Sequence, residues 1–210
     1  MDISELLGNI GTTEEKDKVS YSAGVVLAMS LKDMGFDEVS YDDFAEGMKS
    51  VFTNSFTKIS PKKAIDIFNN YIAILREDLK SQNQEKGMVF LEENSKKPNI
   101  YTLPNGLQYE ILREGNGEIP SIIDEVEVEY EGTLLDKQVF DSTKDIGPQT
   151  FAVSEVIKGW QDALTMMQEG ARWRIFLPPH LAYGENGAPP MIQPNATLTF
   201  VIELNKILKI

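Results

Sequence analysis

The spacing of apolar residues changes once along this chain, close to residue 100. Before that point, apolar side chains recur every three or four residues, as on one face of a helix. Beyond it they alternate with polar residues, as at Val126, Val128 and Tyr130, which is typical of half-buried strands. A strong helix signal at 157–167 interrupts the strands. The sequence therefore predicts an α+β protein with an all-helical N-terminal part and a C-terminal curved antiparallel sheet packed on one short helix.

Local signals divide the helical part into three segments. The first extends from about residue 14 to residue 34, and Gly35 suits its C-terminal cap. A second opens at Ser40, where Asp43 stands three positions on, as in a capping box. The third opens at Pro61, which follows the capping hydroxyl of a serine and occupies the first helical position.

The third helix is expected to be long, because no proline follows until Pro98. Over 61–94 it would have about 34 residues and a length of roughly 50 Å. Its middle, 76–86, is markedly polar, so it cannot be packed inside one small domain. We expect a stalk between two bodies that is solvated at its waist, with Gly87 as the place where it bends or breaks.

The expected domain boundary lies after this stalk helix. Residues 1–97 would form a helical dimerisation domain that includes the stalk at about 61–94, and 98–210 would form a second domain. The short helices are too few to close a core alone, and domains of that size usually need disulfides, metal or a partner chain. The chain has no Cys and one His, so self-association through 1–75 is the remaining remedy. A monomer in which the helices pack on the C-terminal domain is the alternative.

Composition excludes several classes of function. A formal net charge of −13 argues against unaided nucleic-acid binding. Because Cys is absent and His180 is the only His, we expect no disulfide, no thiol catalysis, no Cys-ligated metal and no His-rich metal site. No run approaches the ~18 apolar residues of a membrane span, and the N-terminus lacks the basic and apolar regions of a signal peptide. We therefore expect a cytoplasmic protein, or a periplasmic or exported one if a leader has been removed.

Aromatic residues from several predicted strands and loops converge on one stretch, 156–160, in which Gly159 delivers Trp160 to the start of the short helix. A cavity lined by such residues would be deep, apolar and nearly dry, with a phenol or two and one carboxylate to orient a ligand. That pattern predicts a binding pocket rather than the cradle of a nucleophile. The residues concerned are Tyr130, Phe140, Asp141, Trp160, Tyr183 and Phe200.

Five sequence blocks between about residues 106 and 207 stand in an order that resembles the signature of FKBP-type peptidyl-prolyl cis-trans isomerases. Such an ordered set is far more specific than a single short motif. The resemblance implies an enzyme that needs no metal or cofactor and that binds unfolded or proline-containing polypeptides. The blocks are Val128–Gly132, Phe140–Ser142, Val156–Trp160, Leu181–Gly184 and Ala196–Phe200.

The resemblance also implies roles for single residues. Trp160 would form the pocket floor under the prolyl ring, and Ile157 would offer its backbone N–H to a substrate carbonyl. Tyr183 would offer its hydroxyl, and Asp141 would orient the ligand, although an Asp at this place can also merely cap a turn. The implied catalytic residues are Tyr130, Asp141 and Tyr183, and the implied substrate-binding residues are Phe140, Val156, Ile157, Trp160, Ile192 and Phe200.

One rim of the pocket departs from the family's pattern. The loop 144–150 is shortened, and Ile146 and Gln149 stand where a basic residue and an aromatic wall are usual. In the later loop, Ala188 replaces a frequent histidine and Met191 a usual aliphatic residue. The floor is thus expected to be intact, while substrate preference and affinity for the macrolides tacrolimus and rapamycin stay open.

The helical part carries a second resemblance. Tyr21–Gly24 and Phe44–Gly47 are similar to blocks in the dimerisation region of the bacterial macrophage infectivity potentiator branch of this family. In that branch, intertwined N-terminal helices hold two isomerase domains apart on long helices. The resemblance implies a homodimer.

The implied reaction needs no nucleophile. An X-Pro bond rotates slowly because amide resonance imposes a barrier of about 18–20 kcal/mol. The twisted transition state has lost that resonance and its carbonyl is less dipolar, so a dry aromatic pocket favours it over the planar form. We expect the protein to accelerate this rotation in folding proteins, with chaperone-like activity as a dimer. Two alternatives stay open: a proline-recognising chaperone or adaptor with little turnover, and a purely structural dimeric scaffold.

Overall fold

The computed structural model describes residues 13–209, and the chain divides into two compact units, 1–76 and 77–210. This boundary falls inside the third helix, whereas the sequence placed it after residue 97. The difference arises because the second half of that helix packs against the C-terminal sheet.

The three predicted helices form. They are α2 (Thr13–Asp33), α3 (Tyr41–Phe52) and α4 (Pro61–Ser95). Ser40 caps α3, and its Oγ accepts a hydrogen bond from the backbone N–H of Asp43 at 3.5 Å. The capping signals therefore located the helix starts. None of the helices within 13–209 is long and apolar enough to span a membrane.

The first unit has little core. Along α2 and α3, both of which lie wholly within the described range, no residue is buried. Phe36 packs its ring against Phe68 and Tyr71 of α4, with ring centroids 6.1 and 5.4 Å away. Many large apolar side chains stay exposed, including Val19, Tyr21, Val26, Tyr41, Phe52 and Ile65.

Helix α4 runs unbroken through Gly87, where the sequence predicted a bend or a break, so the helix does not break at this residue. Gly87 is buried, and a Cβ added to it would lie 2.2 Å from Thr197 Oγ1. The glycine therefore permits close packing of the helix against the C-terminal domain.

The polar middle of α4 is docked along one side rather than solvated all round. Lys80 pairs with Glu185 across 2.8 Å. The Asn83 side-chain amide donates to Gln193 Oε1 at 3.1 Å and to the Pro194 carbonyl at 3.0 Å. The spacing of apolar residues could not predict this contact, because the side chains that make it are polar. These bonds explain why the second half of α4 belongs to the second unit.

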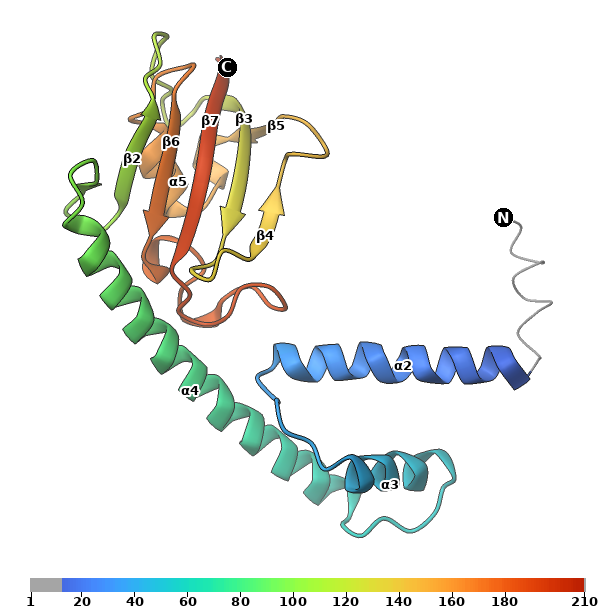
Figure 1. Cartoon of the computed structure of the whole chain (residues 1–210). Helices are drawn as coiled ribbons and strands as arrows, with labels where there is room; N and C mark the ends of the chain where they lie inside the picture. The colour runs from blue at the N-terminus through green and yellow to red at the C-terminus, as the bar shows by residue number, and fades with distance from the viewer. Residues whose placement is uncertain (1–12, 210) are drawn as a thin grey trace. The chain divides into compact units, whose positions relative to one another are not determined.

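A seven-stranded antiparallel sheet forms the body of the second unit (Figure 1). Its strand order is β1-β2-β6-β7-β3-β4, and β5 pairs with β3. Register shifts in β2 and β3 act as bulges, which bend strands and increase their twist. The strands are β1 (Tyr101–Thr102), β2 (Gln108–Arg113), β3 (Glu125–Thr133), β4 (Val139–Ser142), β5 (Gln149–Ala152), β6 (Arg172–Leu177) and β7 (Leu198–Leu208).

Helix α5 (Lys158–Leu164) lies against one face of this sheet (Figure 1). It is shorter than the predicted 157–167, because Thr165 closes it as the C-cap. The alternation in β3 and β7 points one set of side chains at the helix, and these form the centre of the core. They are Val126, Val128, Leu198, Phe200, Ile202 and Leu204.

Candidate active site

A cavity of about 240 Å³ lies beside helix α5 in the second unit. All of the sequence-predicted site residues except Ile192 line it, together with two residues that the sequence did not single out, Phe151 and Glu155. The lining is Tyr130, Phe140, Asp141, Phe151, Glu155, Val156, Ile157, Trp160, Tyr183 and Phe200.

Trp160 forms the buried base of this cavity, with 4% of its surface exposed. Three rings meet its indole at nearly perpendicular angles: Tyr130 at 5.0 Å, Phe200 at 5.3 Å and Phe151 at 6.0 Å between centroids. Edge-to-face contacts of this kind are favourable for aromatic quadrupoles and hold each ring in place. The indole Nε1 is buried and has no hydrogen-bond partner among the described residues.

Two glycines make this arrangement sterically feasible. A Cβ at Gly159 would lie 2.4 Å from Leu177 Cδ2, so only glycine lets the first turn of α5 approach strand β6 this closely. On β3, Gly132 stands opposite Phe200 of β7. A Cβ there would lie 2.7 Å from the ring of Phe140 and 2.8 Å from that of Phe200. The missing side chain leaves room for these two rings to meet edge to face, 5.5 Å apart.

The polar side of the cavity is built from two phenols and one carboxylate. Tyr130 Oη donates to Asp141 Oδ2 at 2.7 Å. The pKa of the Tyr130 phenol is raised mainly by burial and secondly by this bond to Asp141. The pKa of the Tyr183 phenol is raised mainly by burial and secondly by the negative charge of Asp141. Both phenols therefore remain neutral hydrogen-bond donors at physiological pH.

Asp141 does not serve as a turn cap in this structure. The turn after β4 is instead capped by Ser142, whose Oγ accepts from the backbone N–H of Lys144 at 3.2 Å. The carboxylate of Asp141 faces the Tyr130 phenol and lines the cavity.

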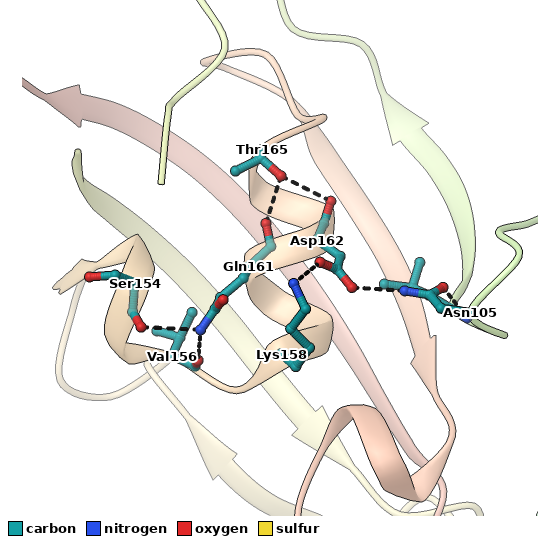
Figure 2. Close-up of polar contacts among 8 residues, drawn as sticks. Asn105, Ser154, Val156, Lys158, Gln161, Asp162 and Thr165 are labelled. Carbon is teal, nitrogen blue, oxygen red and sulfur yellow. Dashed lines mark hydrogen bonds and ion pairs between the residues drawn. The ribbon is translucent and has the colours of Figure 1, made fainter. Parts of the chain in front are cut away.

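The rim of the cavity is the segment between a short 3-10 helix, Val153–Glu155, and helix α5. Val156 and Ile157 line the cavity from this segment, and Glu155, the last residue of the 3-10 helix, lines it beside them. Figure 2 shows how it is held: the side-chain amide of Gln161 donates to the carbonyls of Ser154 at 3.1 Å and Val156 at 2.8 Å.

Ile192 lies away from the cavity wall. It is 5% exposed, belongs to the hydrophobic core and forms an isolated antiparallel bridge with Ala188. Its side chain thus packs in the hydrophobic core. The altered rim position Ile146 is exposed and does not line the cavity.

Phe151 supplies an aromatic wall of the cavity, whereas the sequence put Gln149 at the position where the family usually has such a wall. Strand β5 pairs Phe151 with the buried Val126, which directs the ring to the core face of the sheet. Gln149 instead donates its side-chain amide to the carbonyls of Gly147 and Pro148, both at 3.0 Å. The only local signal for Phe151 was an aromatic residue within a four-residue strand, which is too short for a clear alternation.

Within 13–209, no group of three or more His, Cys, Asp or Glu residues is placed to hold a metal ion. The residues around the cavity instead offer apolar surface, two phenol donors and the carboxylates of Asp141 and Glu155. Such a set can bind and orient an apolar group with a neighbouring carbonyl, and it provides no nucleophile that is paired with a base.

Two family models match the chain. The model described as FKBP-type peptidyl-prolyl cis-trans isomerase matches residues 117–205. The model described as the domain amino terminal to FKBP-type peptidyl-prolyl isomerase matches residues 16–111.

Known proteins are similar to the chain over most of its length. Peptidyl-prolyl cis-trans isomerase Mip of Coxiella burnetii is 39% identical over 93% of this chain and 88% of its own. Outer membrane protein MIP of Legionella longbeachae is 40% identical over 94% of this chain and 88% of its own. The crystal structure of FkpA from Escherichia coli aligns with a TM-score of 0.69 and 28% identity, covering 95% of this chain and 98% of that one. The chain therefore belongs to the FKBP-type peptidyl-prolyl cis-trans isomerases, in the branch that includes Mip.

Proposed function

We propose that a prolyl residue binds over Trp160 in this cavity and that the protein speeds rotation about the peptide bond before that proline. The observation that carries the proposal is the indole at the base of the cavity, held edge to face by Tyr130, Phe151 and Phe200. Six of the ten lining residues are apolar or purely hydrocarbon aromatic or indole side chains, so a ligand that enters the cavity largely leaves water.

Removal from water is the proposed source of catalysis. The planar X-Pro amide is strongly dipolar and is well solvated by water, whereas the twisted transition state has lost much of that dipole. An apolar site therefore destabilises the planar form more than the twisted one, which is differential binding in favour of the transition state. The reaction breaks no covalent bond, so orientation and solvent exclusion are sufficient.

The polar groups would orient the substrate during rotation. Because Tyr130 donates its hydroxyl to Asp141 across 2.7 Å, its ring is held as a wall of the cavity. Tyr183 also lines the cavity and is 39% exposed, so its hydroxyl is accessible to a substrate carbonyl. The backbone N–H of Ile157, at the rim, would bind a second carbonyl of the peptide.

The test is the cis–trans exchange rate of a short X-Pro peptide, measured by NMR with wild type and Tyr183→Phe. Loss of one hydrogen bond of about 1 kcal/mol should lower kcat/KM by roughly five- to tenfold. Tyr101→Phe removes a hydroxyl from an exposed tyrosine outside the cavity and serves as the control. Unaccelerated exchange by wild type, with suppression of aggregation retained, would favour the alternative of a proline-recognising chaperone or adaptor.

A homodimer through residues 1–75 is part of the proposal, with chaperone-like activity on unfolded chains. Its support is the apolar surface that α2 and α3 leave exposed, since such surface is normally covered. Sedimentation of Val26→Glu, compared with Lys32→Glu on the same helix, tests it. The dimer should weaken only in Val26→Glu, and a monomeric wild type would refute it.

Unfolded and proline-containing polypeptides are the proposed partners, and tacrolimus and rapamycin are proposed as weak competitors. The base of the cavity supports macrolide binding, whereas Gln149, Ile146 and Ala188 alter its surroundings. Displacement of an X-Pro peptide by tacrolimus tests this part. Failure to compete at high micromolar concentration would remove macrolides from the proposal.

For location, we propose a site outside the cytoplasm. The support is one relative, from Legionella longbeachae, that is named as an outer membrane protein. Fractionation of cells that express the native gene tests this proposal, and recovery in the cytoplasmic fraction alone would contradict it.

A further inference from the structure

Gln161 follows Trp160 directly on helix α5, and its side chain reaches back toward the cavity rim (Figure 2). Its Nε2 donates to the carbonyl of Ser154 at 3.1 Å and to the carbonyl of Val156 at 2.8 Å. One amide group therefore ties together both sides of Glu155, which lines the cavity. From here on, the rim means the segment Ser154–Ile157, which leads into α5, and not the loop 144–150.

Helix α5 has few other means of fixing its first turn. It is seven residues long, and its N-cap residue, Ile157, makes no side-chain capping bond. A short helix without a cap has little intrinsic stability, and its first N–H groups lack intrahelical partners. The bonds from Gln161 connect this first turn to the rim that leads into it.

The neighbouring residue holds the helix from another side. Asp162 accepts from Lys158 at 2.6 Å on the same helix and from Asn105 at 2.8 Å on the loop before β2 (Figure 2). Asp162 thus fixes α5 relative to that loop, while Gln161 fixes the rim relative to α5. The backbone N–H groups of Trp160 and Gln161 also donate to the carbonyl of Ile157, at 2.9 and 3.1 Å, at the end of the rim next to the helix. The Gln161 side chain adds the bonds to Ser154 and Val156, farther along the rim.

We propose that Gln161 is a positioning residue of the isomerase: it holds Val156 and Ile157 over Trp160 and so determines how tightly the rim binds the substrate. The inference rests on the proposed prolyl-binding role of the cavity. Gln161 itself is not among the residues that line the cavity, so it acts through the rim.

Two substitutions separate the amide's hydrogen bonds from its bulk. Gln161→Met keeps a similar length and removes both donors. Gln161→Glu keeps the shape but places a carboxylate against two carbonyl oxygens, which it cannot bind unless it is protonated. Gln168→Glu makes the same chemical change at an exposed position after the helix and is the matched control.

Both Gln161 variants should raise KM for an X-Pro peptide about three- to tenfold at neutral pH, the size expected for one or two lost hydrogen bonds. The value of kcat should stay within about twofold, because the rim contacts the ground state and the transition state alike. Amide hydrogen exchange at 155–157 should become faster in both variants and stay unchanged in Gln168→Glu.

Acidification should partly rescue Gln161→Glu alone. A carboxyl beside two carbonyls protonates more readily than usual and then donates one bond, so KM should approach the wild-type value below about pH 5. The ionisable groups nearest in sequence on the rim and α5 are Glu155, Lys158 and Asp162. Wild type, Gln161→Met and Gln168→Glu contain all three, so their profiles account for that titration.

Unchanged KM and unchanged exchange at 155–157 in both Gln161 variants would overturn the proposal. A lower unfolding midpoint with kcat and KM unchanged would also overturn it, because that result assigns Gln161 to stability alone. If Gln161→Glu does not fold, Gln161→Met decides. Should wild type fail to accelerate exchange of the peptide, the proposed function fails, and hydrogen exchange at 155–157 still decides whether Gln161 holds the rim.

Discussion

The phenol of Tyr130 donates a hydrogen bond to the carboxylate of Asp141 across 2.7 Å, on the polar side of the cavity above Trp160. The two residues come from neighbouring strands, β3 and β4, and their pairing orients the Tyr130 ring against the indole. This hydrogen bond, which cannot be read from the sequence, links the carboxylate of the site to one of its aromatic walls.

The Tyr130 phenol should make stability depend on pH in the alkaline range. Its pKa is raised in the folded state, first by burial and then by the bond to Asp141, so its contribution is full below the unfolded value of about 10. As pH rises above that value, the contribution is progressively lost. The free energy of unfolding should therefore fall more steeply above about pH 10 in wild type than in Tyr130→Phe. Urea titrations at a series of pH values check this, and equal slopes would contradict it.

Gly87→Ala should destabilise the second unit. Alanine is the better helix former by about 1 kcal/mol, yet the added Cβ would lie 2.2 Å from Thr197 Oγ1. Overpacking of this kind costs about 1–3 kcal/mol, so the unfolding midpoint should fall. Thr197→Ala removes the clashing hydroxyl, and the double variant should recover most of the loss. A gain in stability for Gly87→Ala alone would show that the helix does not pack this closely.

Asn83→Ala should weaken the attachment of α4 to the loop before β7. The half-buried amide donates to Gln193 and to the carbonyl of Pro194, and such bonds contribute about 0.5–1.5 kcal/mol each. Gln82→Ala on the exposed side of the helix is the control, because its bond goes to Asp78 on the same helix. Chemical unfolding of both variants compares them. Equal free energies of unfolding would mean that the docked face is not formed in solution.

Sequence patterns predicted those elements whose signals are local and long enough to repeat. The cap at Ser40, the start at Pro61 and the alternation in β3 and β7 needed only neighbouring residues. Strands β1, β4 and β5 have two to four residues, so no period could be recognised in them. They form by pairing with the longer strands β2 and β3.

The candidate site divides in the same way. The ordered sequence blocks predicted most of the residues that line the cavity, including Trp160, because those residues fall within the blocks. Phe151 was missed because its direction is set by the pairing of β5 with β3. Ile192, predicted as a substrate-binding residue, lies in the core cluster and not in the cavity lining, which the sequence could not show. Gly87 was interpreted as the place where the helix bends or breaks, because the sequence does not show that the fold brings Thr197 close to it.

The indole N–H resonances of the two tryptophans test the central claim most directly. Trp160 forms the base of the cavity, whereas Trp173 stacks on Tyr109, 4.5 Å away, and does not line the cavity. During NMR titration with an X-Pro peptide whose exchange is accelerated, the Trp160 resonance should shift and the Trp173 resonance should stay in place. Accelerated exchange with an unmoved Trp160 resonance would contradict the account.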